Sequence, residues 1–274
     1  MKVILFGSNG MLGSYIKSYF MYKNLNIICL TRADIDISIA NHKHLENKLK
    51  ECEINKDTII INAAGLIPQA SAQRTIHNYD YIKVNSIFPS ILSTISSKYD
   101  SKLIHITTDC VFSGSKGSYN ENDDHDTTDM YGVSKSLGEN IDCTIIRTSI
   151  IGEEINNKRS LLEWVIKNKN GKINGYKNHI WNGVTCLQLA KIIFNIIKNN
   201  KYWIGVRHVF SPFSVSKYDL VSFINKTYNL NIIIDEYDCD KKIDKSLTSV
   251  YKDLLLDIPS IETQIESQYR FELI

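Results

Sequence analysis

The sequence Gly7-Ser8-Asn9-Gly10-Met11-Leu12-Gly13 has the glycine spacing G-x-x-G-x-x-G and follows a short apolar run, Val3–Phe6. Apolar residues at helical spacing continue from Met11 to Phe20, so these segments predict a strand, a tight turn and a helix. The glycines leave room for a diphosphate beside the backbone, and free N–H groups at the helix start attract that anion. We therefore expect a dinucleotide to bind at Gly7, Asn9, Gly10, Met11, Leu12 and Gly13.

Short apolar runs alternate with helical patterns through the first half of the chain, which is typical of a parallel sheet with helices between its strands. The further strands that we expect are Asn26–Leu30, Thr58–Ile61, Leu103–Ile106 and Cys143–Ile146. The helices that we expect between them are His42–Cys52, Tyr79–Lys98 and Met130–Asn140. The predicted fold class is α/β, a Rossmann-type doubly wound parallel sheet with a smaller C-terminal substrate-binding lobe.

The pattern is less regular beyond residue 150. We expect helices at Leu161–Lys167, Leu187–Ile197 and Ser216–Tyr228, the last capped by Ser214 or Ser216. Val206–Phe210 is predicted to be a strand that returns to the sheet, and Ile232–Ile234 a short strand within a polar tail. We assign residues 1–150 to a nucleotide-binding domain, with 187–212 returning to its sheet, and residues 151–186 and 213–274 to the lobe.

The composition excludes several classes of function. The 274 residues include 32 basic and 30 acidic side chains, which are interleaved, so a dedicated nucleic-acid binder is not expected. The six cysteines form no C-x-x-C pair, which argues against a zinc site and for reduced thiols in the cytoplasm. For the same reason we expect no bound metal. No apolar run reaches the roughly 18 residues of a membrane span, so we also expect no membrane segment.

The residue that follows the second strand indicates the cofactor. An acid there binds a ribose 2′-hydroxyl, whereas a base accepts a 2′-phosphate. Here the strand runs into Leu30-Thr31-Arg32, and an acid comes only later, at Asp34. Since a guanidinium matches the geometry of a phosphate, Arg32 favours NADP, with NAD as the alternative. A solvent-exposed loop arginine is the competing interpretation.

The segment Tyr131–Lys135 has the spacing Y-x-x-x-K, which places both side chains on one face of a helix. A lysine charge lowers the pKa of the tyrosine, whose hydroxyl can then protonate a keto oxygen. The spacing alone is not specific, since Tyr19–Lys23, Tyr79–Lys83 and Tyr237–Lys241 share it. Tyr131 is preferred because it follows a strand that ends in Thr107-Thr108, at the sheet edge where ligands bind.

Thr107–Gly114 and Asp129–Glu139 together resemble the extended short-chain dehydrogenase/reductases, and most of all the dTDP-4-dehydrorhamnose reductase family. Segments similar to that family also include Asn62–Gly65, Val84-Asn85, Arg147–Ser149 and Asn182–Thr185. The resemblance spans residues 1 to 190 and fades toward the C-terminus. It implies that Thr108 polarises a keto oxygen, that Tyr131 protonates it, and that Lys135 holds the cofactor ribose. The other residues that it places around the cofactor are Asn62, Ala63, Ala64 and Asn85.

Cys110 departs from this family, which commonly has tyrosine there. GDP-fucose synthases and plant-type UDP-rhamnose epimerase/reductases have a cysteine at this position and use it to epimerise the sugar. Because Cys110 follows Thr108 by two residues on a segment expected to be extended, both side chains would share a face. The thiolate could remove the proton at C3, with Lys135 influencing its pKa and Glu163 or His179 as the opposing acid. Packing as a small apolar side chain is the alternative.

The region from residue 150 to residue 186 is expected to cover the substrate. Its candidate contacts are Glu163, Trp164, His179, Trp181 and Asn182. Trp164 also fits a core position, and His179 also fits a surface loop. Lys245 is a further candidate, because its segment resembles one that meets the diphosphate in relatives.

The resemblance implies NADPH-dependent reduction of the C4 keto group of a UDP- or dTDP-linked 4-keto-6-deoxy sugar in rhamnose-type biosynthesis, with C3 epimerisation as an added activity. The alternative is a catalytically silent NADP-binding subunit, like the regulatory subunit of methionine adenosyltransferase. The joint presence of Thr108, Tyr131 and Lys135 favours the enzyme. The expected partner is a nucleotide sugar, and the oligomeric state stays open between a monomer and a homodimer.

Overall fold

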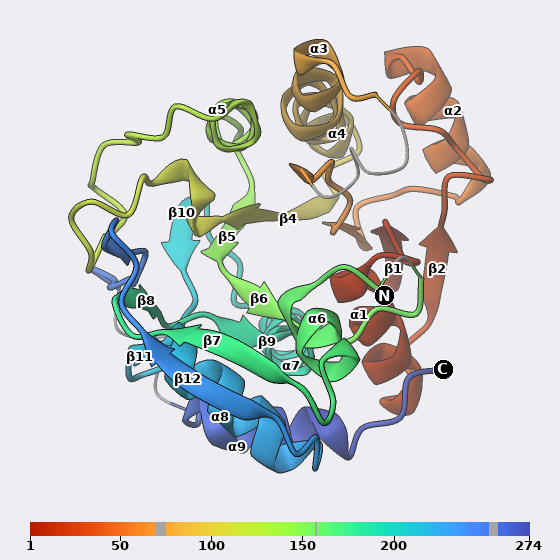
Figure 1. The fold of residues 1–274 in the computed structure, drawn as a ribbon. Coiled ribbons are helices and arrows are strands. Elements are labelled where there is room, and N and C mark those ends of the chain that lie inside the picture. The colour runs from red at the N-terminus through yellow and green to blue at the C-terminus, as the bar shows by residue number, and fades with distance from the viewer. Residues whose placement is uncertain (69–74, 157, 252–256) are drawn as a thin grey trace.

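A computed structural model describes residues 1–68, 75–156, 158–251 and 257–274, and a six-stranded sheet lies at its centre (Figure 1). The strand order is β10-β5-β4-β3-β1-β2, and every neighbouring pair is parallel. The strands are β1 (Lys2–Phe6), β2 (Ile27–Leu30), β3 (Thr58–Asn62), β4 (Lys102–Thr108), β5 (Thr144–Thr148) and β10 (Gly205–His208). The chain moves from β1 to one side and then returns to the other, so the order reverses between β1 and β3. Ligands of open α/β sheets bind at such a reversal.

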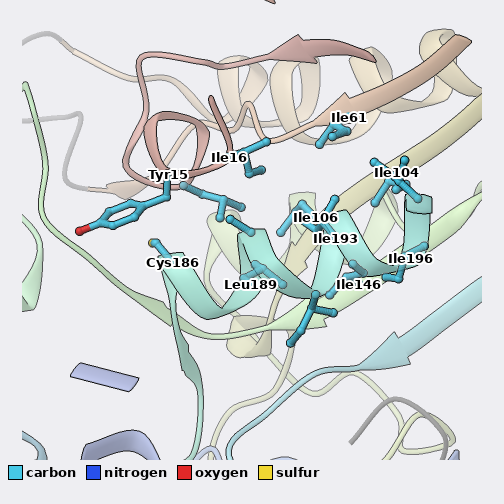
Figure 2. Close-up of a cluster of buried hydrophobic side chains, with 14 of the residues drawn as sticks. Tyr15, Ile16, Ile61, Ile104, Ile106, Ile146, Cys186, Leu189, Ile193 and Ile196 are labelled. Atoms are coloured by element: carbon cyan, nitrogen blue, oxygen red, sulfur yellow. The ribbon is translucent and has the colours of Figure 1, made fainter. Parts of the chain in front are cut away.

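Helices cover both faces of the sheet because its strands are apolar on both sides. On one face, α1 (Met11–Tyr22) and α7 (Cys186–Lys198) pack on the sheet. Figure 2 shows this cluster, in which Tyr15 and Ile16 of α1 and Leu189 of α7 meet isoleucines of β3, β4 and β5. On the other face, α2 (His42–Glu51) and α4 (Phe88–Lys98) cover the sheet. The predicted fold class is confirmed.

The elements that lead to the site extend from the carboxyl ends of the strands. After β3 come α3 (Asn78–Ile82) and a π-helical turn, Lys83–Ile87, which runs directly into α4. After β4 come a short 3₁₀ helix, Asp109–Val111, a long loop, and α5 (Met130–Leu137). Asp129 caps α5 by accepting the N–H of Gly132 at 2.9 Å. This cap fixes where the helix begins, and hence where Tyr131 stands.

A smaller lobe follows the sheet and lies at the bottom of Figure 1. Its helices are α6 (Leu161–Lys167), α8 (Lys217–Thr227) and α9 (Ile261–Tyr269). Its strands are β6 (Ile150–Ile151), β7 (Lys172–Tyr176), β8 (His179–Trp181), β9 (Val184–Thr185), β11 (Val215–Ser216), β12 (Ile233–Tyr237) and β13 (Ile243–Asp244). They form one three-stranded and two two-stranded sheets around a separate apolar core.

The predicted late elements agree with the structure except in the tail. Ser216 is the cap of α8, and the strand expected at Val206–Phe210 is β10, which pairs with β5. The expectation of a polar tail is wrong for α9, whose Ile261 and Ile265 are buried in the lobe core. No helix among the described residues is long and apolar enough to cross a membrane.

Candidate active site

The glycine-rich loop lies where the strand order of the sheet reverses. Gly7 has a φ of +80°, and a Cβ there would lie 2.8 Å from the backbone nitrogen of Ala64, which follows β3. Only glycine fits both the conformation and this close approach. Gly10 caps α1 and has no side chain that could occupy the N–H groups of the first turn. The loop therefore presents backbone donors at a helix start, which suits the diphosphate of a dinucleotide.

Two buried asparagines shape the loop beyond β3. Asn62 accepts the N–H of Ala64 at 3.1 Å, and its amide nitrogen lies 3.1 Å from Nδ1 of His105. Asn85 accepts the N–H of Leu66 at 2.9 Å and donates to the Leu66 carbonyl at 3.0 Å. Both amides thus hold protein backbone. They fit the predicted cofactor side of the site by shaping its wall.

Arg32 and Asp34 share the turn that follows β2 but differ in what they contact. The Asp34 carboxylate accepts from the backbone and hydroxyl of Thr31 at 2.8 and 2.7 Å, and these hydrogen bonds lower its pKa. The Arg32 side chain is 69% exposed, with its Nε 3.9 Å from Asp36. The Arg32 side chain therefore projects into solvent, whereas the Asp34 carboxylate is occupied by hydrogen bonds within the turn.

Thr108, Tyr131 and Lys135 come together between the end of β4 and α5. The Thr108 hydroxyl acts on Tyr131, whose pKa it lowers. Burial raises the pKa of Tyr131, and nearby Cys110 raises it further, so its hydroxyl stays protonated. Lys135 donates from Nζ to the carbonyl of Ile106 on β4 at 2.9 Å. Burial lowers the pKa of Lys135 to about 8.

The close approach of α5 to the end of β4 depends on Gly132, the residue after Tyr131. A Cβ at Gly132 would lie 2.3 Å from the carbonyl oxygen of Cys110. Other tyrosines with the same spacing have a different environment. In the pairs Tyr19–Lys23 and Tyr79–Lys83, the ammonium lies over the tyrosine ring at 5.7 and 4.9 Å. Placement relative to β4, as the sequence analysis used it, distinguishes Tyr131.

Cys110 corrects one premise of the sequence analysis. Thr108 and Cys110 were expected on one extended segment, but Cys110 lies in the 3₁₀ helix Asp109–Val111, and Thr108 caps that helix by accepting the N–H of Cys110 at 3.2 Å. The expectation of an extended segment is therefore wrong, although the Thr108 side chain does act on the Cys110 thiol and both act on Tyr131. Burial, reinforced by the charge of Asp109, raises the pKa of the thiol to about 11. The cation that opposes this shift is Lys245 of the lobe, where the sequence had pointed to Lys135.

The predicted lobe residues are largely engaged in holding the lobe together. Asn182 makes two 2.8 Å hydrogen bonds with the backbone of Leu247. Buried Glu163 accepts the N–H of Glu154 at 2.9 Å, and Trp181 lies in the lobe core. Nε2 of His179 lies 3.2 Å from the carbonyl of Lys241. Lys245 differs, because its charge acts on Asp109 and Cys110 beside Thr108.

Lys217, the first residue of α8, is a charged group at this site that the sequence analysis missed. Its Nζ lies 5.2 Å from the centre of the Trp181 ring. Burial lowers the pKa of Lys217, while Asp109 and Cys110 favour its charged form. A lysine at the start of a helix is unfavourable because the helix dipole is positive there. A lysine directly after the cap residue Ser216 could therefore have indicated that an acidic side chain lies near it, as Asp109 does.

The comparison with protein families assigns the chain on sequence grounds. The model of the RmlD substrate-binding domain matches residues 1–241. The chain belongs to this family. The match includes Thr108, Cys110, Tyr131 and Lys135, whereas Lys245 and α9 lie outside it.

Relatives of this RmlD-family chain include SpsK, a spore coat polysaccharide biosynthesis protein of Bacillus subtilis. It is 29% identical over 156 residues, which are 54% of this chain and 52% of SpsK. The dTDP-4-dehydrorhamnose reductase of Aggregatibacter actinomycetemcomitans is 26% identical over 55% of this chain and 49% of that protein. The matches thus span about half the length of these curated relatives.

The fold of the RmlD-family chain is shared over nearly its full length with solved structures. The dTDP-4-dehydrorhamnose reductase of Bacillus anthracis, solved with NADP, has a TM-score of 0.82 at 21% identity and covers 98% of each chain. The UDP-glucose 4-epimerase of Thermotoga maritima has a TM-score of 0.75 at 13% identity over 98% of this chain and 97% of that one. At these identities the likeness concerns the fold.

Proposed function

We propose that this protein is an NADPH-dependent reductase of the C4 keto group of a nucleotide-linked 4-keto-6-deoxy sugar. The observation that carries the proposal is that Thr108, Tyr131 and Lys135 gather between β4 and α5. The ammonium of Lys135 lies close to Gly65, in the loop after β3 that packs on the glycine-rich loop. The names of the relatives, dTDP-4-dehydrorhamnose reductases among them, favour a dTDP- or UDP-linked sugar and a place in deoxysugar biosynthesis.

The residues present fit a dinucleotide. Gly7 lets the loop pack against the backbone of Ala64, where a Cβ would not fit, and the start of α1 offers N–H donors to the diphosphate. Arg32 would bind a 2′-phosphate, and Lys135 would bind the ribose from within the wall shaped by Asn62 and Asn85. The bound cofactor supplies the hydride.

The protein's own residues then manage the proton. Thr108 would donate a hydrogen bond to the keto oxygen, and Tyr131 would give that oxygen its proton as charge develops there. The charge of Lys135 stabilises the tyrosinate that remains. Because the pKa of Lys135 is about 8, this charge is present below that pH and is lost above it. Turnover should therefore fall on the alkaline side.

A panel of substrates tests this function. NADPH oxidation would be followed with dTDP-, UDP- and GDP-linked 4-keto-6-deoxy sugars, with a hydroxyl or an acetamido group at C2, and the products identified by NMR. We expect reduction at C4 with at least one dTDP- or UDP-linked sugar. Tight NADP binding without any turnover would instead favour the alternative, a silent NADP-binding subunit of the same fold.

C3 epimerisation through Cys110 is a second candidate activity, favoured by the electrostatic contact of the thiol with Tyr131. With a pKa of about 11, the Cys110 thiol is protonated at neutral pH and cannot accept the C3 proton, so Lys245 would have to favour the thiolate when substrate is bound. In heavy water, without reductant, wild type would place deuterium at C3 of the sugar, and Cys110→Ser would do so far more slowly. A wild type that incorporates none is a simple reductase in which Cys110 packs.

A further inference from the structure

A buried ion pair joins the end of the α5 segment to β5 and has no part in the proposed proton transfer. The Glu139 and Arg147 side chains are 5% and 2% exposed. Arg147 donates from Nε to Oε1 of Glu139 at 3.1 Å and from Nη2 to Oε2. Its guanidinium also lies 5.1 Å from the centre of the Phe112 ring. Burying two charges costs about as much free energy as their attraction returns, so stability alone does not account for the pair.

The pair is connected to the strand that carries Thr108. Thr107, Arg147 and His208 are neighbours across β4, β5 and β10. The Thr107 hydroxyl donates to Oε1 of Glu139 at 2.7 Å. Glu139 lies four residues after Lys135, in the turn that follows α5, and Lys135 itself donates to the carbonyl of Ile106. Two links therefore span the gap between α5 and β4, one through Lys135 and one through Glu139.

The other end of the pair reaches α5 through His125, in the loop between β4 and α5. Nη2 of Arg147 lies 2.7 Å from Nε2 of His125, and Nδ1 of His125 lies 2.6 Å from the hydroxyl of Ser136 on α5. The result is one continuous chain of hydrogen bonds, in the order Ser136, His125, Arg147, Glu139 and Thr107. Its two ends are each one residue away from a proposed catalytic group, Lys135 at one end and Thr108 at the other.

The chain requires neutral histidines. A guanidinium only donates hydrogen bonds, so Nε2 of His125 and Nε2 of His208, which lies 2.9 Å from Nη1 of Arg147, must both accept. The protons are then on Nδ1, which faces Ser136 in one ring and the Thr248 carbonyl at 2.7 Å in the other. Protonation of His125 would bring a donor against the Arg147 donor. Nε2 would then turn to Oε2 of Glu139, 3.5 Å away, and the link between His125 and Arg147 would break.

The charged groups around both rings agree with this assignment. Those that act on His125 are Glu139, Arg147, Asp124 and Asp126, and those that act on His208 are Arg147, Glu121 and Glu139. Burial, as the largest cause, and Arg147 lower the pKa of each histidine, although the carboxylates oppose this. Each ring is therefore neutral at physiological pH and gains a proton only below the ordinary histidine range.

The geometry points to a positioning role: Glu139, Arg147 and His125 hold Lys135 and Tyr131 on α5 in register with Thr108 on β4, and they do so only while His125 is neutral. This inference rests on the proposed reductase function for its effect on turnover. Its effect on Lys135 can also be followed through NADP⁺ affinity, without any substrate. Activity is thus predicted to have an acid limit set by His125, which lies outside the reacting groups.

Histidine NMR tests the chain without reference to catalysis. In ¹⁵N-labelled protein titrated from pH 8 to pH 5, His125 and His208 should stay in the neutral Nδ1–H form below about 6.5, the ordinary histidine pKa. The signal of His44, which is exposed on α2, serves as the reference in the same spectra. His44→Gln and His125→Gln assign the two signals. A His125 that gains its second proton at or above the ordinary histidine value of about 6.5, or that carries its single proton on Nε2, would overturn the inference.

Variants test the positioning role. His125→Ala should lower turnover by about ten- to a hundredfold, because small displacements of reacting groups cost that much, and should weaken NADP⁺ binding. His125→Gln, which can accept from Arg147 and donate to Ser136, should restore both at neutral pH. The affinity of wild type for NADP⁺ is expected to fall below pH 6.5, and His125→Gln should remove this fall. The 2′-phosphate titrates equally in both proteins, so their difference isolates His125.

Two controls keep the outcomes separate. His208→Gln leaves the hydrogen-bond chain from Ser136 to Thr107 intact, so its NADP⁺ affinity should still fall below pH 6.5. His44→Gln should match wild type at every pH. Equal pH profiles for wild type and His125→Gln would overturn the inference, whatever the melting temperatures. If no keto sugar is reduced but the NADP⁺ profiles differ as stated, the proposed function fails and the positioning role stands.

Discussion

The sheet half and the lobe use their polar side chains in opposite ways. Beside the sheet, Thr108, Tyr131 and Lys135 converge on one another at the edge where the strands end. In the lobe, Asn182 and Glu163 are occupied with nearby backbone, and Gln264 of α9 binds three partners in the lobe. A long parallel sheet supplies a rigid frame, whereas a lobe of short strands needs its polar groups to hold itself together.

The substitution with the largest expected effect on this contrast between the halves is Tyr131→Phe. Tyr131→Phe removes the proton donor, and general acid catalysis contributes about a hundredfold or more, so turnover should fall by at least about two orders of magnitude. The measurement is kcat for NADPH-dependent reduction, with the melting temperature as a check on folding. Tyr79→Phe is the matched control, because Tyr79 has the same spacing to a lysine but is exposed. Near-normal turnover in Tyr131→Phe would contradict the proposed site.

The difference between the halves also explains which features the sequence predicts. The strands of the sheet are continuous apolar runs with glycine or hydroxyl residues at their ends, so their places and the catalytic positions follow from local pattern. The lobe strands are two to five residues long, and α9 binds partly through buried Gln264 and Gln268. A helix that buries glutamines has no clear apolar stripe, so its sequence looks like a polar tail.

Contacts between distant segments account for the remaining errors. Cys110 was expected on an extended segment, but the capping hydrogen bond from its N–H to Thr108 winds the chain into a 3₁₀ turn. Lys217 meets Asp109 across the site, and 108 positions separate them in the sequence. Local periodicity carries no information on such pairs. The candidate positions at the sheet edge were therefore predictable from local pattern. Of the two lobe lysines that act on Asp109, Lys245 was predicted only through the family resemblance, and Lys217 was missed.

A substitution in α9 tests whether the polar side chains of the lobe stabilise the fold without contributing to cofactor binding. Gln264 accepts the N–H of Thr185 at 3.0 Å and donates to the Ser211 hydroxyl at 2.9 Å. Gln264→Ala would leave a buried donor unpaired, which costs about 1–3 kcal/mol, so the free energy of unfolding should fall by that amount. Urea titration measures it. NADP⁺ affinity should change little. Glu262→Ala removes only a partly exposed ion pair with Lys226 from the same helix, and such pairs contribute little, so it should leave stability nearly unchanged. A large loss of NADP⁺ affinity in Gln264→Ala would show that the halves do not divide the work in this way.

The smallest expected effect concerns Arg32, a polar side chain of the sheet half that projects into solvent. If it binds the 2′-phosphate, a charge-assisted hydrogen bond worth about 1.5–3 kcal/mol is lost in Arg32→Ala, so NADPH should bind about tenfold more weakly or worse. NADH, which lacks that phosphate, should bind as it does to wild type, and the two dissociation constants can be compared by fluorescence titration.

Arg32→Lys retains the charge without the fork of donors that matches a phosphate, and its affinity for NADPH should fall between those of wild type and Arg32→Ala. Equal weakening of NADPH and NADH would mean that Arg32 supports the turn after β2, as Asp34 does through Thr31. Arg32 would then join Asn62 and Asn85, the polar side chains of the sheet half that hold its own backbone.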